Sequence, residues 1–166
     1  MTPPDNLDPF DLFRTSVAVR VRRIHAQAMI DPAGDWPGVL FLDVPGETVD
    51  ISLHRIVGLD EAGKHRLATE VLPRRIRRLG ATRFCWLTPA WLDDTDPADE
   101  CLALVFADRV RRAMLVAEVM RKPGRRPRLG RWQPGPRGRA PVEISGRFVE
   151  PLVAALAPLE PDDCPP

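Results

Sequence analysis

The sequence predicts an α+β fold, an antiparallel or mixed sheet of about five strands packed against two to three helices. Three observations support it. Apolar residues recur at helical spacing in residues 10–28, 68–79 and 148–156, short apolar runs bounded by turn residues lie between these stretches, and no repeat or compositional break divides the chain. We therefore expect one globular domain over residues 9–157, with flexible tails at 1–8 and 158–166.

Three helices are expected from the residues at their ends and from the apolar residues that recur along one side of each. Asp8 followed by Pro9 is a good helix start, and the stripe that follows ends near Asp31. Asp60 is the predicted N-cap of a second helix that Gly80 ends, with Pro73 kinking or dividing it. Ser145 is the candidate cap of a last helix, which Pro151 should disturb.

Five strands are expected between these helices. Residues 39–44 and 49–53 form the first two, the second with one wet face because polar and apolar residues alternate. Residues 84–87 and 101–107 are continuous apolar runs, typical of strands buried on both faces. The stretch 110–120 is either a third core strand or a helix, because it also contains helix-forming residues. We expect the helices to cover one face of the sheet.

Composition indicates an ordinary globular protein, with 44% hydrophobic and 28% charged residues in a chain of 166. The net charge of +1 excludes a protein that is basic all over. Lys64 and Lys122 are the only lysines among 24 basic residues, a bias that GC-rich coding explains. No apolar run approaches the roughly 18 residues of a membrane helix, and the first residues do not resemble a signal peptide. A cytoplasmic protein is expected.

The sequence contains no recognisable catalytic, cofactor or metal motif. Three cysteines and three histidines are scattered without metal-ligand spacing, and no glycine-rich phosphate loop is present. Cys85 and Cys101 lie in apolar runs, where a thiol is inert. We expect no cofactor and no metal site.

The most unusual feature is the basic loop expected at residues 121–141, an irregular segment with no acidic residue between Glu118 and Glu143. Arginine's planar fork suits phosphate and carboxylate groups, and a tryptophan ring can stack on a base. The candidate anion- or partner-binding residues are Arg121, Lys122, Arg125, Arg126, Arg128, Arg131 and Trp132, and Arg137 and Arg139 continue the charge. The alternative is a solvated loop whose charge reflects coding bias.

A second candidate surface lies between the first two core strands. Asp93, Asp94 and Asp96 belong to an acidic loop whose spacing does not match a calcium-binding loop. The loop is either a solvated connection or a partner for the basic loop in the same or another subunit. Trp86 is expected in the core, and Trp91 is a candidate interface anchor because Pro89 should break the strand's regularity.

Our first functional hypothesis is a non-enzymatic binding or regulatory module that contacts an anionic partner, protein or nucleic acid, through the arginine-rich loop. The second is a small enzyme whose site is assembled from residues distant in sequence. The third is a subunit active only within a complex, including a homo-oligomer joined through the oppositely charged loops. No membrane partner is expected.

Overall fold

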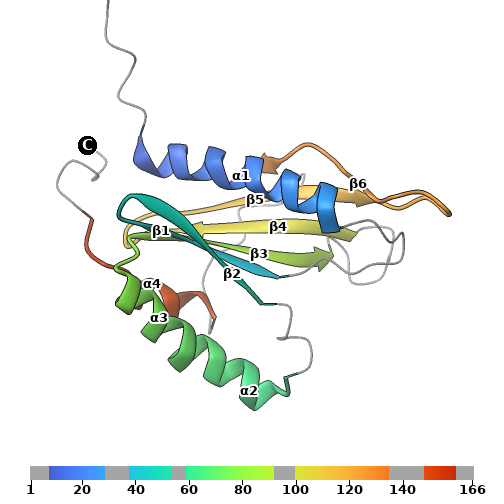
Figure 1. Cartoon of the computed structure of the whole chain (residues 1–166). Coiled ribbons are helices and arrows are strands. Elements are labelled where there is room, and N and C mark those ends of the chain that lie inside the picture. The colour runs from blue at the N-terminus through green and yellow to red at the C-terminus, as the bar shows by residue number, and fades with distance from the viewer. Residues whose placement is uncertain (1–7, 29–37, 54–58, 92–99, 135–147, 160–166) are drawn as a thin grey trace, which may run out of the picture.

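The computed structural model of the chain describes residues 8–28, 38–53, 59–91, 100–134 and 148–159. It confirms the α+β class, and the order of elements differs from the predicted one in that five strands instead of three precede the last helix. The sheet is antiparallel and runs in the order β2-β1-β3-β4-β5-β6, with β7 pairing with β5 beside β6 (Figure 1). Its strands are β1 (Val39–Val44), β2 (Glu47–Ser52), β3 (Arg83–Trp91), β4 (Glu100–Ala107), β5 (Arg112–Met120), β6 (Arg128–Leu129) and β7 (Gln133–Pro134).

Helices cover both faces of the sheet, so the expectation that they share one face was wrong (Figure 1). The first core lies under α1 (Pro9–Ala28), where Val17 and Val21 meet Phe41 and Phe106. The second lies under α3 (Leu72–Leu79) and α4 (Val149–Ala155), where Ile76 and Leu152 meet neighbouring strand residues. Successive strand residues point to opposite faces, so strands that are apolar throughout must be covered twice.

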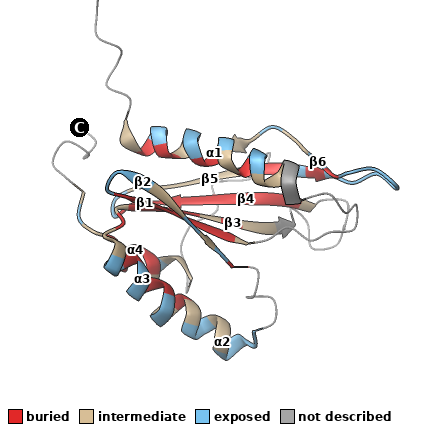
Figure 2. Cartoon of the chain, in the orientation of Figure 1, coloured by how far each residue is buried: buried red, intermediate tan, exposed pale blue. Residues whose placement is uncertain are grey.

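Helix α1 forms where its cap and stripe predict it. The Phe10 backbone N–H donates to the Asp8 carboxylate at 3.0 Å, which satisfies one of the free donors of the first turn. Phe10, Phe13, Val17 and Val21 are buried at helical spacing, while the opposite side of the helix is exposed (Figure 2). Burying this stripe attaches the helix to the sheet.

The second helical stretch is divided, as Pro73 predicts, but the division is a π-helical turn one turn earlier. Helix α2 (Glu61–Arg66) starts at Asp60, whose carboxylate accepts from the Gly63 N–H at 2.7 Å. The π turn η2 (Leu67–Val71) leads into α3, with Pro73 in the first turn of α3. A proline has no N–H to give to the preceding turn, and the wider π turn accommodates that loss. Gly80 then ends α3 with φ 66°, the left-handed conformation expected of it.

Two proline effects predicted from the sequence are absent. Strand β3 continues through Pro89, which pairs with Leu102 of β4. On the other side, the described pairing of β1 with β3 ends at Leu87, so no described β1 residue needs a backbone N–H from Pro89. Pro151 lies in the first turn of α4, where a missing N–H costs little, and the described helix starts after Phe148. Ser145, the predicted cap, lies outside the described residues.

The segment from Arg112 onward is strand, which settles the open alternative for residues 110–120. The chain then turns back along the outer edge of β5 through β6 and β7, so residues 121–134 are not the irregular loop expected. Backbone groups at this edge thereby gain partners, and the prolines are tolerated because the returning strands are edge strands. The remaining residues of the predicted loop, 135–141, lie outside the described part of the chain.

Candidate anion-binding site

The basic residues at 121–131 form the end of a β-hairpin, which we call the basic arm (residues 118–131). Its turn has Pro123 and Gly124 at the two central positions, and the Arg125 N–H donates to the Lys122 carbonyl at 3.1 Å. Gly124 has φ 69°, so this is a type II turn, which favours glycine at its third position. The strands pair at Val119–Leu129 and Met120–Arg128, and the Gly130 N–H donates to the Glu118 carbonyl at 2.9 Å.

Cations occupy most of the exposed surface of the basic arm. The arm projects beyond the sheet, and its tip is exposed (Figure 2). Lys122, Arg125, Arg126, Arg128 and Arg131 are all exposed, and within the described residues none of them makes an ion pair. Five like charges on one short hairpin repel one another, so an anion that contacts several of them would be held well.

Arg121 differs from the other predicted anion-binding residues, because an acidic residue of the sheet already holds it. Its Nε lies 2.5 Å from Oε2 of Glu100, and its Nη2 lies 2.8 Å from Oε1 of the same carboxylate. This two-point geometry is the strong form of an arginine–carboxylate pair. Arg121 therefore anchors the base of the arm and adds little net charge to its surface.

Trp132 lies at the sheet and not at the tip of the arm. Its ring is half-buried and packs against the first core, as do Ile24, Leu115 and Leu129. These side chains come from α1, β5 and β6, so the tryptophan helps to attach the arm to the rest of the domain. A stacking role for Trp132 is therefore limited to the part of its ring that stays exposed.

Helix α1 supports the arm through two polar contacts. Nη2 of Arg22 donates to the Gly130 carbonyl at 3.0 Å, and Nε2 of His25 donates to the Pro127 carbonyl at 3.0 Å. Partial burial lowers the pKa of His25, the bond to Pro127 acts in the opposite direction, and the nearby Arg22 charge lowers it further. The imidazole is therefore neutral at pH 7, and its one ring proton serves the bond to the arm.

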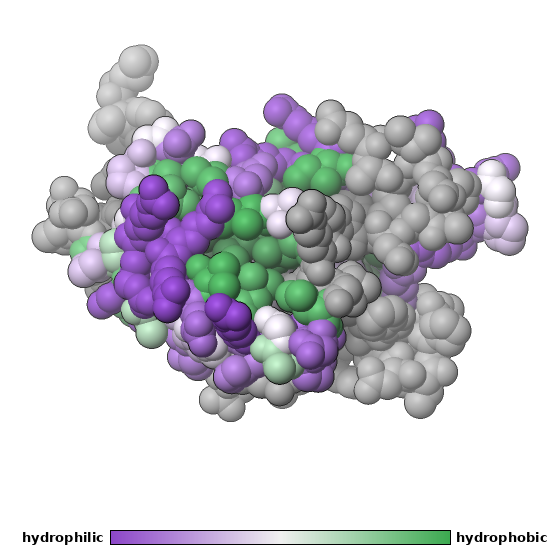
Figure 3. Space-filling view, turned by 60° about the horizontal axis from the view of Figure 1, so that its bottom comes forward, coloured by the Kyte–Doolittle hydropathy of each residue, from purple (hydrophilic) through white to green (hydrophobic). Residues whose placement is uncertain are grey.

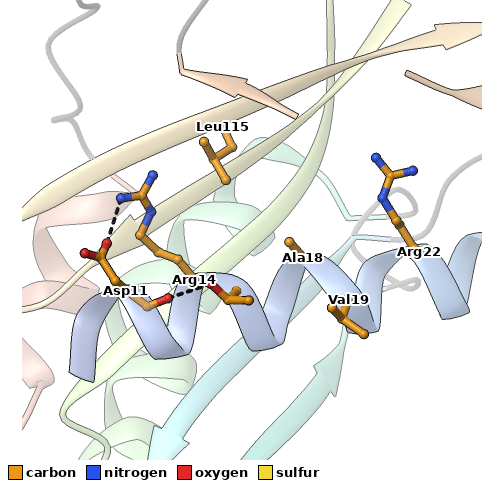
Figure 4. A pocket seen from close by; sticks show the side chains of 7 residues that line it. Asp11, Arg14, Ala18, Val19, Arg22 and Leu115 are labelled. Carbon is orange, nitrogen blue, oxygen red and sulfur yellow. Dashed lines mark hydrogen bonds and ion pairs between the residues drawn. The ribbon is translucent and has the colours of Figure 1, made fainter. Parts of the chain in front are cut away.

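A groove continues the site along α1. It has a volume of about 410 Å³ and is lined by Asp11, Arg14, Thr15, Ala18, Val19, Arg22 and Leu115. Arg14 and Arg22 lie two turns apart on the helix beside it, and Arg22 is the residue that contacts the arm (Figure 4). Arg14 pairs with Asp11 at 3.0 Å, an exposed pair that contributes little. An extended anion lying on the arm can therefore continue past Arg22 into this groove.

A second basic surface, which we did not predict from the sequence, lies on α3. Arg74, Arg75, Arg77 and Arg78 are exposed on α3, and three of them line a hollow of about 590 Å³ with Val71 and Leu79. Hydrophilic side chains gather on the face of the molecule that carries this helix (Figure 3). The run Arg74-Arg75-Ile76-Arg77-Arg78 is visible in the sequence, and its one apolar residue marks the buried side of the helix.

The acidic candidates cannot be placed with the arm. Asp93, Asp94 and Asp96 lie outside the described residues, and of Trp91 only the backbone is described, paired with Glu100 at the end of β3. Trp86, expected in the core, is partly buried and packs against the second core. Glu100, the described acidic residue that follows these positions, contacts the basic arm through Arg121.

The described residues show no other site with an obvious chemistry. They contain no group of three metal-ligating side chains, and no helix among them is long and apolar enough to cross a membrane. Cys85 and Cys101 are buried and not joined in a disulfide. Burial raises the pKa of the Cys85 thiol well above its usual value, so that thiol is an inert core group.

Comparison with known proteins adds no assignment: no family model, no curated protein and no solved structure matches this chain.

Proposed function

We propose that this protein is a binding module that holds double-stranded nucleic acid through its basic arm. The observation that carries the proposal is the set of five exposed cations on a projecting two-stranded hairpin, with no ion-pair partner in the described part of the chain. A two-stranded β-ribbon has the dimensions that the major groove of a duplex admits. Cations on the turn and the returning strand of such a ribbon can reach the phosphates on the groove walls.

Two further features favour a nucleic acid over a small anion. The five cations are distributed over the turn and the returning strand, from Lys122 to Arg131, and all are exposed. The groove along α1 extends the contact surface, with Arg22 at the junction. An elongated polyanion uses such a surface, whereas a single phosphate would use one or two of its side chains.

The test is the salt dependence of binding to a duplex of about 20 base pairs, followed by fluorescence anisotropy. If all five cations contact phosphates, the plot of log affinity against log salt has a slope of about −4.5. Replacing Arg125 and Arg126 by glutamine should make that slope shallower by about 1.8. The matched control replaces Arg74 and Arg75 of α3, an exposed pair on the helix that covers the other face of the sheet.

The control separates the two basic surfaces. An unchanged slope in the arm variant, with a loss in the α3 variant, would move the site to α3. Salt-insensitive binding, or no binding at low salt, would overturn the proposal. Capture of an acidic protein that survives nuclease treatment, without binding to the duplex, would favour a protein partner instead.

A further inference from the structure

An apolar cavity of about 330 Å³ lies on the side of the sheet opposite α1. Its wall is formed by α2, η2 and α3, by strands β3 and β4, and by the start of α4. Its main lining residues are Leu67, Ala68, Leu72, Trp86, Val105 and Phe148. Hydrophobic side chains gather in a hollow beside hydrophilic ones on this side of the molecule (Figure 3). The cavity is separate from the basic arm, so its ligand need not be a nucleic acid.

The wall chemistry selects an apolar ligand. Trp86 and Phe148 meet edge to face, with ring centroids 6.0 Å apart, and form an aromatic side of the cavity. The hydroxyl of Thr88, which also lines it, donates to the Pro89 carbonyl at 3.1 Å. Among the described lining residues only the acceptor capacity of this hydroxyl remains beside the Thr88 position, so a ligand with several polar groups there would lose more hydration than it regains, which is costly. Most of the ligand must therefore be hydrocarbon.

Among the described lining residues Lys64 is the charged one, so the cavity has one charged end. Its Nζ lies 3.0 Å from Oε1 of Glu61 in a pair that is largely exposed, so the pair contributes little to stability. An ammonium group has three donors, which leaves capacity for a second carboxylate. An anionic head group at Lys64 and a hydrocarbon tail toward Trp86 and Phe148 satisfy both ends of the site.

The π turn gives this cavity part of its wall. Leu67 and Ala68 belong to η2, the turn that is wider than an α-helical one. Such turns occur frequently at functional sites. With about 30 Å³ for each water-sized group, the volume has room for about eleven non-hydrogen atoms. We propose that the cavity binds a monocarboxylate amphiphile of about eight to ten carbons, with its carboxylate at Lys64.

The first test uses decanoate, octanoate, hexanoate and decanol as probes in isothermal titration calorimetry. Each methylene removed from the tail should weaken binding about fourfold, so hexanoate should bind about 15-fold more weakly than octanoate. Lys64→Gln should weaken decanoate binding severalfold and leave decanol unchanged. Equal affinity for hexanoate and octanoate, or no binding of any probe, would overturn the inference.

The second test fills the cavity. Ala68 is 2% exposed and lines the cavity, so Ala68→Leu should abolish binding of both decanoate and decanol. The matched control is Val71→Thr, in the same π turn, because Val71 is 47% exposed and lies outside this cavity. If Ala68→Leu does not fold, Leu67→Trp at the half-buried neighbouring position serves the same purpose. Unchanged binding in a folded filling variant would show that the probe lies elsewhere.

The basic arm and the apolar cavity are separate surfaces, so a protein that binds no duplex can still bind decanoate. The variant with glutamine at Arg125 and Arg126 should bind decanoate as the unmodified protein does. A parallel loss in that variant would mean that the amphiphile uses the basic arm, and would overturn the assignment to the cavity.

Discussion

Glu100 and Arg121 join the start of β4 to the end of β5 through two contacts, Nε to Oε2 at 2.5 Å and Nη2 to Oε1 at 2.8 Å. The pair fixes the base of the basic arm to a central strand of the sheet. It also separates the predicted cluster of cations into one that is neutralised within the protein and five that are exposed. The arm is thereby both attached and charged.

Glu100→Gln should therefore change stability and binding in opposite directions. The loss of an ionic pair with this geometry should lower the free energy of unfolding by about 1 kcal/mol, measured by urea denaturation. Removing the Glu100 charge makes the base of the arm more positive, so the salt slope of duplex binding should steepen by up to about 0.9. Arg121→Gln is the companion variant, and it should lower stability without steepening the slope.

The turn of the basic arm depends on Gly124. At φ 69° an alanine side chain is strained, so Gly124→Ala should lower the free energy of unfolding by about 1 kcal/mol or shift the turn. Duplex affinity should fall with it, because the cations lose their fixed spacing. Gly124→Asn is the control, since asparagine tolerates this conformation better than alanine does. Equal loss in both variants would mean that side-chain bulk, and not backbone conformation, is responsible.

His25 should make stability depend on pH. Its pKa is lower in the folded protein than the usual 6.5, so the unfolded chain binds the proton more readily. The contribution is fully present above pH 6.5 and is lost as the pH falls through the folded-state pKa. In His25→Gln, the fall in unfolding free energy between pH 7.5 and about pH 5 should be smaller than in the unmodified protein. His65→Gln, at an exposed position of α2, is the control that should leave the profile unchanged.

Asp108 should be among the most sensitive polar positions. Its side chain is fully buried and accepts from the Val110 N–H at 2.7 Å, the Arg111 N–H at 2.5 Å and the Arg111 Nε at 3.0 Å. Arg111 in turn contacts Asp8 and lies over the Phe10 ring at 4.5 Å, which ties the turn to the start of α1.

Asp108→Ala should lower the free energy of unfolding by about 3 kcal/mol, because it leaves the two backbone N–H groups and the Nε of Arg111 without their acceptor. Asp11→Ala, at an exposed carboxylate, should change it by less than about 0.5 kcal/mol. A small effect at Asp108 in urea denaturation would mean that water replaces the carboxylate.

Local signals predicted much of this fold. The Asp60 cap and the left-handed Gly80 depend on residues close in sequence, and both are found where the sequence places them. The apolar run at residues 101–107 also indicated a strand buried on both faces. A strand buried on both faces requires a helix layer on each side of the sheet, whereas we expected a single layer.

The basic arm was harder to predict, because its structure depends on pairing with β5. Pro123, Gly124 and Pro127 are typical of loops, and nothing local shows that Leu129 pairs with Val119 or that Gln133 pairs with Val116. The apolar cavity was also invisible, since Ala68, Trp86 and Phe148 are far apart in the chain and meet only in the folded domain. The cations of the basic arm are visible in the sequence, but their arrangement in space depends on the pairing of the arm with β5.

Each face of the sheet depends on a helix from one end of the described chain. Without α1, the side of the sheet that carries Phe41, Leu104 and Phe106 would meet water, and without α4 the side around Leu42 and Phe84 would keep only the cover of α3. A fragment that starts after Ala28 or stops before Val149 should therefore aggregate. Any shortened version used to isolate the arm or the cavity has to keep both flanking helices.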